Sequence, residues 1–305
     1  MNRVIEITNL NHQYADGTVS LENVSLAIDE GEMVAVIGQN GAGKTTLFLH
    51  LNGSIRSFDE NVLVFGQDIG TMPIEKRICT VGVVFQDPDD QLFMPTVYDD
   101  VAFGPTNMGL SEEEVKRRVK EALSTVGLDG FEDRVPHHMS YGQKKRAALA
   151  AVLSMEPRIL VFDEPTANLD PRSRAVFIGL INDLNKEKGI TTIVAMHDVN
   201  AVPEVANRVI LLNKTVVADA APSVVFSNVR LLEENNLDVP DICKIFSILE
   251  CYGCASDVPP LTFYGAARIL DDMIEKNGGT IPLRRSDTTE EKVAELIQRF
   301  CVSGK

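Results

Sequence analysis

A glycine-rich stretch that ends in a lysine and two threonines has the clearest chemistry in the sequence: Gly38-Gln39-Asn40-Gly41-Ala42-Gly43-Lys44-Thr45-Thr46. It follows the apolar run 33–37, which predicts a buried strand, and precedes the run 47–51, which predicts a helix. When a strand, a glycine-rich loop and a helix follow one another, the backbone N–H groups of the loop can converge on a phosphate at the helix N-terminus. Lys44 could reach the terminal phosphates and Thr45 could bind Mg²⁺. We favour phosphate binding over a tight turn with an incidental lysine.

Two adjacent carboxylates end a second apolar run. Residues 159–162 predict a buried central strand, and Asp163 and Glu164 follow at its carboxyl end. Neighbouring side chains of a strand point to opposite faces, so the two acids cannot bind one metal ion with the same geometry. Buried acids are costly unless they are used. We expect Asp163 to hold Mg²⁺ through water and Glu164 to polarise the water that attacks the γ-phosphorus.

Polar residues end two further predicted strands. Gln86 follows the apolar run 81–85, and His197 follows the run 191–196. Ligands of parallel α/β sheets lie at the carboxyl ends of the strands. Gln86 is therefore placed to contact Mg²⁺ or the attacking water, although a polar residue that caps a strand is the alternative. His197 could donate a hydrogen bond to a γ-phosphate oxygen.

A second helix N-terminus that suits a phosphate begins at Ser140-Tyr141-Gly142-Gln143. Ser140 is a good N-cap residue, and Gly142 would allow a ligand to approach closely. Three cations follow, and taken alone they predict a solvated face: Lys144, Lys145 and Arg146.

The predicted elements indicate an α/β fold in two parts. Residues 4–10 and 19–28 alternate apolar and polar side chains, which predicts an antiparallel β subdomain. Tyr14 lies in this hairpin, where its ring could stack on adenine or simply pack. A mixed or parallel core sheet should follow within residues 1–222, with a helical subdomain at about 89–153. Residues 223–305 predict short helices and a small helical C-terminal domain.

Composition narrows the range of functions. The formal net charge of −15 argues against a surface for nucleic acid, which would need clustered Lys and Arg. No apolar run approaches the roughly 18 residues of a membrane-spanning helix. The chain opens on a strand pattern without the apolar core of a signal peptide. We expect a protein that works inside the cell, with any membrane role supplied by a partner.

The cysteines do not indicate a disulfide framework, because their number is odd: Cys79, Cys243, Cys251, Cys254 and Cys301. Cys251 and Cys254 have the spacing of metal ligands, but no second pair completes a set of four. We favour plain thiols over redox or metal chemistry.

The order of the motifs carries more information than any one of them. The order is residues 38–46, Gln86, Ser140–Gln143, Phe162-Asp163-Glu164, Leu169-Asp170 and His197. Together they closely resemble the ATP-binding subunit of ABC transporters over the first 220 or so residues. The resemblance implies an ABC-type P-loop ATPase fold that uses ATP and Mg²⁺.

Individual roles follow from this resemblance and not from spacing alone. Tyr14 would stack on adenine, while Lys44 and the loop amides would hold the phosphates. Thr45, Gln86 and Asp163 would organise Mg²⁺. Glu164 would be the catalytic base, and His197 would contact the γ-phosphate.

The resemblance also implies a second ATPase subunit. Ser140–Gln143 would contact the ATP bound to the opposite subunit of a head-to-tail homo- or heterodimer, which ATP closes and hydrolysis reopens. Asp170 belongs to the same implied set of nucleotide-binding residues. The chain departs from the family at Tyr141, where a glycine is usual, but it keeps Ser140 and Gly142.

A narrower resemblance rests on residues 85–93, Pro95-Thr96-Val97 and residues 100–105. This stretch is similar to the energy-coupling factor ATPases, which drive uptake of cobalt, nickel or vitamins, and the helical extension agrees. A membrane coupling subunit would contact the chain near Asp89, Asp90, Gln91 and Phe93, and a substrate-binding membrane subunit would be engaged indirectly. We expect an ATPase at the cytoplasmic face of the cell membrane.

Two alternatives to a transport ATPase remain. One is a soluble ABC ATPase of DNA repair or translation, and the other is a nucleotide-binding protein without catalysis. Soluble ABC ATPases of DNA repair carry a long coiled-coil insertion, whereas only about fifty residues of helical pattern fit here. Those of translation carry two copies of the motif set, and this chain carries one. A nucleotide-binding protein without catalysis is the third possibility, and the intact Glu164 argues against it.

Overall fold

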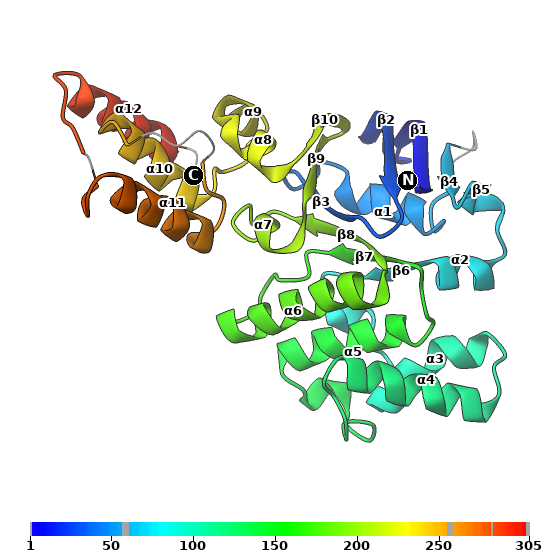
Figure 1. Ribbon diagram of the computed structural model, residues 1–305. Coiled ribbons are helices and arrows are strands. Elements are labelled where there is room, and N and C mark those ends of the chain that lie inside the picture. Colours follow the sequence, from blue (N-terminus) through cyan, green and yellow to red (C-terminus); the bar gives the residue numbers. More distant parts are fainter. Residues whose placement is uncertain (1, 57–60, 255–258, 282, 303–305) are drawn as a thin grey trace.

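The structure is a computed structural model that describes residues 2–56, 61–254, 259–281 and 283–302. Its strands form a four-stranded sheet of order β2-β1-β4-β5 and a six-stranded sheet of order β10-β9-β3-β8-β7-β6 (Figure 1). The strands are β1 (Arg3–Gln13), β2 (Val19–Asp29), β3 (Met33–Ile37), β4 (Val62–Val64), β5 (Gln67–Asp68), β6 (Val81–Val84), β7 (Ile159–Asp163), β8 (Thr191–Met196), β9 (Arg208–Asn213) and β10 (Thr215–Ala220). The fold is α/β, as the sequence predicts.

Helices cover the six-stranded sheet and extend beyond it on two sides (Figure 1). The α-helices are α1 (Lys44–Leu51), α2 (Ile74–Thr80), α3 (Val97–Asn107), α4 (Glu112–Thr125), α5 (Tyr141–Leu153), α6 (Pro171–Lys188), α7 (Val202–Val205), α8 (Pro222–Ser227), α9 (Val229–Glu234), α10 (Asp241–Cys251), α11 (Phe263–Lys276) and α12 (Thr289–Val302). Short 3₁₀ turns are η1 (Ile69–Thr71), η2 (Pro88–Asp90) and η3 (Pro136–His138).

Parallel pairing brings the predicted site residues to one edge of the large sheet. Strands β6, β7, β8 and β3 run parallel, and their carboxyl ends lie within one residue of each other: Val84 pairs with Phe162, Asp163 with Ala195, and Ile37 with Met196. All four strands are rich in apolar residues, which suits strands covered on both faces. The loops that follow them therefore meet at the same carboxyl edge.

Alternate residues of β3 fill two separate cores. Val34 and Val36 pack with α1 and the antiparallel sheet, whereas Ala35 and Ile37 pack with the helices of the other face. This division follows from the two-residue period of a strand. Helix α1 is thereby held between the hairpin β1–β2 and the large sheet.

The segment predicted as a helical subdomain, residues 89–153, contains turns and helices α3, α4 and α5 and contributes no strand. Each helix begins at a side-chain cap: Thr96, Ser111 and Ser140 each accept a hydrogen bond from a backbone N–H three residues on. In Figure 1 these helices lie below the large sheet, together with α6.

The described part of residues 223–305 contains helices α9 to α12 and most of α8. Val225, Phe226 and Leu232 of α8 and α9 are buried in the same core as the large sheet. Asn236 Nδ2 donates to Gln39 Oε1 at 3.0 Å, so this segment touches the glycine-rich loop. Helices α10 to α12 form the left-hand end of Figure 1. Within the predicted domain 223–305, residues 255–258, 282 and 303–305 lie outside the described residues.

Two further findings concern the cysteines and the membrane. Cys79, Cys243, Cys251 and Cys254 carry free thiols, and the side chain of Cys301 lies outside the described set. No helix in the described part of the chain combines the length and apolar character needed to cross a bilayer.

A buried histidine pair joins the hairpin to α1. His50 is 1% exposed, and its Nε2 lies 3.2 Å from Nδ1 of His12. The His12 ring in turn packs edge-on against Tyr14, with ring centroids 4.7 Å apart. Burial, and next the neighbouring His12, lower the pKa of His50 to about 4. His50 therefore stays neutral in the folded protein at neutral pH.

We predict that this histidine makes the fold acid-sensitive. Between about pH 6.5 and pH 4 the unfolded chain binds the His50 proton and the folded chain does not, so the free energy of unfolding falls as the pH falls, by up to about 3 kcal/mol. His50→Phe should flatten the pH dependence of denaturant unfolding in this window. The exposed His137→Gln is the control and should keep it. Equal slopes for His50→Phe and the native chain would contradict the assignment.

Candidate functional site

A cavity of about 430 Å³ opens at the carboxyl edge of the large sheet. It gathers residues from separate parts of the chain, among them most of those predicted from the sequence. The lining consists of Tyr14, Thr18, Val19, Ser20, Gln39, Asn40, Gly41, Ala42, Gly43, Lys44, Thr45, Thr46, Gln86, Asp163, Glu164 and Lys214. Gly38 adjoins the cavity through its carbonyl, which contacts Lys44.

Close backbone approach explains two of the loop glycines. A Cβ on Gly38 would clash with the carbonyl oxygen of Leu212, and one on Gly43 would clash with that of Ser20. Gly43 also has φ +98° as it caps α1, a conformation that suits glycine. The loop can therefore curl tightly between β3 and α1 with its N–H groups at the helix N-terminus.

Lys44 is buried inside the loop that carries it. Its Nζ donates to the carbonyl oxygens of Gly38 at 2.6 Å and Gln39 at 3.3 Å, and it lies 3.9 Å from Glu164 Oε1. Burial lowers the pKa of Lys44, while Glu164 and Asp163 oppose that shift. The ammonium group is thus positioned in the cavity and partly balanced by carboxylates.

The oxygen atoms at the other side of the loop suit a hard divalent cation. Thr45 Oγ1 donates to Asp163 Oδ2 at 2.8 Å, and Gln86 lines the same cavity. A hydroxyl, a carboxylate and an amide oxygen are the kinds of ligand that Mg²⁺ takes in proteins. The donor set therefore fits the metal predicted from the sequence.

Glu164 stands in an unusual backbone conformation next to His197. Its φ is +48°, which is uncommon for a residue other than glycine and occurs at functional sites. Glu164 Oε2 lies 2.6 Å from His197 Nδ1 and accepts a hydrogen bond from the His197 backbone N–H at 3.2 Å. His197 does not line the cavity, but its contact with Glu164 connects it to the cavity wall.

The second predicted phosphate-binding segment, Ser140–Gln143, does not line this cavity. Ser140 and Gln143 form a reciprocal capping box at the start of α5. Tyr141 OH donates to the Gln86 carbonyl at 3.4 Å. Asp170 likewise lies outside the cavity and caps α6 through the backbone N–H groups of Arg172 and Ser173.

The expectation that residues 144–146 form a solvated face is wrong. Lys145 is 2% exposed, and its Nζ donates to the carbonyl oxygens of Glu164 at 3.0 Å and Pro165 at 2.9 Å. Burial lowers the pKa of Lys145 to about 8, against the opposing effect of Glu164. Lys144 binds Asp89 at 2.7 Å, and Arg146 donates to two carbonyl groups after α4.

The sequence patterns predicted Tyr14 but did not indicate other residues of the cavity, among them Ser20 of β2 and Lys214 of the β9–β10 turn. Tyr14 OH and Ser20 Oγ both lie within hydrogen-bond distance of Thr46 Oγ1, at 2.8 and 2.7 Å. Lys214, in the turn between β9 and β10, completes the wall. Ser20 could have been predicted from its position in the strand that follows Tyr14, whereas no local sequence pattern indicates that Lys214 lines the cavity.

We predict that Lys145 supports the backbone of Glu164. Lys145→Met leaves two carbonyl groups without their donor, and we expect the free energy of unfolding to fall by about 1–3 kcal/mol. Lys144→Met, which breaks a half-exposed ion pair, should cost less than about 1 kcal/mol. Denaturant unfolding of both variants measures the difference. A Lys145→Met chain as stable as the Lys144→Met chain would refute this role.

Comparisons with known proteins agree with the site. A family model described as "ABC transporter" matches residues 21–167. A putative ABC transporter ATP-binding protein of Methanosarcina acetivorans is 50% identical, over 82% of this chain and 77% of that protein. The energy-coupling factor transporter ATP-binding protein EcfA of Methanocaldococcus jannaschii is 46% identical, over 81% of this chain and 89% of that protein.

Solved structures give the same answer. The structure of cbiO1 from Clostridium perfringens, part of the ABC transporter complex cbiONQ, matches with a TM-score of 0.68 and 39% identity, over 77% of this chain and 95% of that one. A dimeric ATP-binding cassette in a post-hydrolysis state with ADP and Pi matches with a TM-score of 0.65 and 27% identity, over 72% and 98%. The chain belongs to the ABC transporter ATP-binding proteins and is an ATPase of the energy-coupling factor type.

Proposed function

We propose that this chain hydrolyses ATP in the cavity around Lys44, with Glu164 as the catalytic base. The observation that carries the proposal is the contact of Lys44, Thr45, Asp163 and Glu164 across the carboxyl edge of one sheet. Tyr14 stands at the hairpin end of the same cavity, with its hydroxyl anchored on Thr46. An adenine ring stacked there would place its phosphates toward the glycine-rich loop.

Mg²⁺ would be held by the Thr45 hydroxyl, with Asp163 and Gln86 around it. When bound, the ion neutralises charge that develops on the phosphate oxygens. Lys44 adds a second positive charge from inside the loop. Since Thr45 and Asp163 already contact each other, both oxygen atoms face the same small region.

The two carboxylate oxygens of Glu164 have different surroundings, one beside His197 and one in the cavity. Its Oε2 is held by the backbone and the ring of His197, and its Oε1 faces Lys44 in the cavity. Oε1 is therefore the atom that would accept a hydrogen bond from the attacking water. His197 would keep Glu164 in place and present the other ring nitrogen to a γ-phosphate oxygen.

The catalytic site would be completed by a second ATPase subunit, either another copy or a related chain. Ser140–Gln143 begins α5 at an N-terminus that does not reach the chain's own cavity. Such a helix N-terminus suits a phosphate group. The similarity to a dimeric cassette supports a head-to-tail pair in which each α5 faces the partner's glycine-rich loop.

We predict that Glu164→Gln abolishes ATP turnover and leaves an ATP-bound dimer. The amide retains the shape of the carboxylate but cannot take a proton from water. Phosphate release should fall to background, while gel filtration with ATP and Mg²⁺ should show a dimer that persists. The exposed Glu187→Gln on α6 should hydrolyse ATP normally. Hydrolysis by Glu164→Gln at the native rate would show that the base lies elsewhere.

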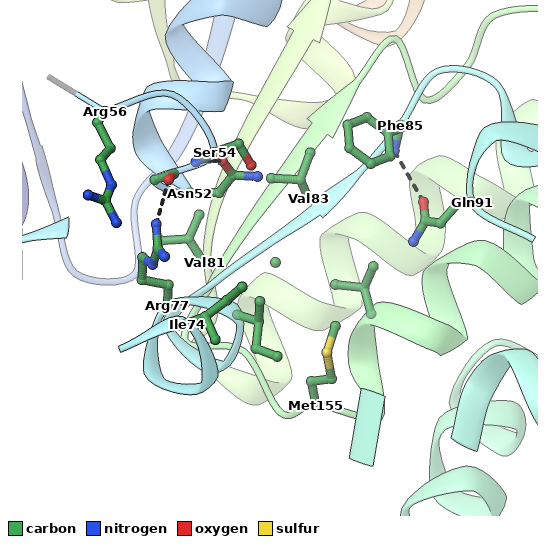
Figure 2. Close-up of a pocket in the computed structure, with 14 residues that line it drawn as sticks. Asn52, Ser54, Arg56, Ile74, Arg77, Val81, Val83, Phe85, Gln91 and Met155 are labelled. Carbon is green, nitrogen blue, oxygen red and sulfur yellow. Dashed lines mark hydrogen bonds between the residues drawn. The ribbon is translucent and has the colours of Figure 1, made fainter. Parts of the chain in front are cut away.

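A membrane subunit would dock near Asp89, Asp90, Gln91 and Phe93, in the turn that follows Gln86. Gln91 of this turn borders a hollow of about 480 Å³. Figure 2 shows Gln91 beside this hollow together with Val83, Phe85 and Met155. Gln91 accepts from the Phe85 N–H at 3.3 Å and donates to the Ala148 carbonyl at 3.1 Å. The turn after Gln86 is thus fixed to α5.

Phe93 is the exposed apolar residue of this turn. It is 64% exposed and packs edge-on against Phe103, itself exposed, with ring centroids 5.0 Å apart. Buried Asp100 accepts from the N–H groups of Phe93 and Met94, both at 3.0 Å, and so fixes the turn that presents this ring. Asp90 is exposed beside it, while Asp89 is paired with Lys144.

We predict that Asp90→Arg combined with Phe93→Asp prevents association with the membrane subunit. The double change replaces an apolar contact with a charge and inverts the charge beside it. Co-purification from membranes should be lost, while binding of ATP in solution should be retained. Phe263→Asp, at an aromatic residue that is 84% exposed on α11, should leave co-purification unchanged. Undiminished co-purification of the double variant would exclude docking at this turn.

The transported solute would be a transition metal ion such as cobalt or nickel, or a vitamin. The energy-coupling factor relatives and the likeness to cbiO1 support this class of solute, and they support a peripheral location at the cytoplasmic face of the membrane. Identification of the small substrate-binding membrane protein in the purified complex would name the solute. The soluble DNA-repair or translation alternative is not favoured by these relatives.

A further inference from the structure

Lys214 is a second lysine of the nucleotide cavity. It occupies the turn between β9 and β10, about 170 residues after the glycine-rich loop, yet it lines the same cavity as Tyr14 and Lys44. Its backbone N–H donates to the Ala42 carbonyl at 2.9 Å, and its own carbonyl accepts from the Glu22 N–H at 2.8 Å. The turn is thus bound to both the glycine-rich loop and β2.

The backbone of Lys214 is in a conformation that suits glycine. Its φ is +61°, in the left-handed region that lysine adopts at an energetic cost. A glycine at this position would avoid that cost and keep both backbone hydrogen bonds. Eight residues of the described chain other than glycine have a positive φ, and two of them, Glu164 and Lys214, line this cavity. Because Lys214 also lines the cavity, its side chain is our candidate for a further contact with the ligand.

The side chain of Lys214 has charge available for a ligand. Two lysines line the cavity, and Lys44 is already held by the Gly38 carbonyl and near Glu164. Lys214 is exposed and makes no ion pair with any carboxylate of the described residues. The chain has a net charge of −15, so a lysine ammonium group at the cavity without an ion-pair partner among the described residues favours an anionic ligand.

The contacts of Lys214 place it away from the proposed metal end of the cavity. Its backbone is fixed to Ala42 and to β2, the strand that carries Ser20, whereas Thr45, Asp163 and Gln86 form the metal end. We propose that Lys214 binds the α-phosphate and ribose of the nucleotide. This inference rests on the proposed ATP site and adds a contact that ATP and ADP share.

The test compares Lys214→Gly and Lys214→Arg with the native chain by calorimetric titration of ATP and ADP in the presence of Mg²⁺. Glycine suits φ +61°, so the Gly variant should unfold at the same temperature as the native chain or higher. Its affinity should fall about fivefold for both nucleotides, as expected for one exposed charge-assisted contact. The Arg variant should stay within twofold, and the difference should shrink at high salt.

Three outcomes would overturn the inference. Native affinity of Lys214→Gly for both nucleotides would show that the side chain makes no contact. A loss confined to ATP would place Lys214 at the γ-phosphate instead. A native chain that bound neither nucleotide would refute the proposed ATP site itself. Native binding of both nucleotides that is abolished by Lys44→Ala would support that site, so that the first two outcomes then concern Lys214 alone.

Discussion

The buried ammonium group of Lys44 is the interaction on which the site depends. It is held 2.6 Å from the Gly38 carbonyl and 3.9 Å from Glu164, in a cavity wall where Asp163 and Glu164 are each only 7% exposed. Buried carboxylates are unfavourable unless cations and hydrogen bonds compensate them. Lys44, the Thr45 hydroxyl and His197 provide that compensation, and each comes from the end of a strand or the start of α1.

Helix α5 connects three parts of the molecule that act in the proposed cycle. Its N-terminus carries Ser140, its first turns hold the Glu164 backbone through Lys145, and its middle accepts the side chain of Gln91 at Ala148. The ion pair of Lys144 with Asp89 adds a second connection to the proposed docking turn. A movement of that turn by a membrane partner would therefore act directly on the helix that carries Ser140 and on the base.

The sequence predicted those parts of the site that are local in the chain. The glycine-rich loop and the strand ends at Gln86, Asp163 and His197 are each specified by a short run of residues, and parallel pairing brings them to one edge. Helices in the C-terminal segment could likewise be predicted from the spacing of apolar residues there.

Contacts between side chains and backbone groups that are far apart in the chain could not be predicted from the sequence. The partners of Lys145 are carbonyl oxygens of a loop, which have no signature in the sequence, so a buried cation looked like a solvated one. The His12–His50 pair and the place of Lys214 likewise depend on how the hairpin and the β9–β10 turn lie over the glycine-rich loop.

In the proposed head-to-tail dimer, Lys44 and Ser140 of one chain serve two different nucleotide sites. The most direct test mixes two inactive variants, Lys44→Ala and Ser140→Arg, and measures phosphate release. A pair of these chains contains one site with an intact glycine-rich loop and an intact Ser140. We predict that neither variant hydrolyses ATP alone and that the mixture recovers activity. Hydrolysis by Ser140→Arg alone at the native rate would show that Ser140 does not complete the partner's nucleotide site.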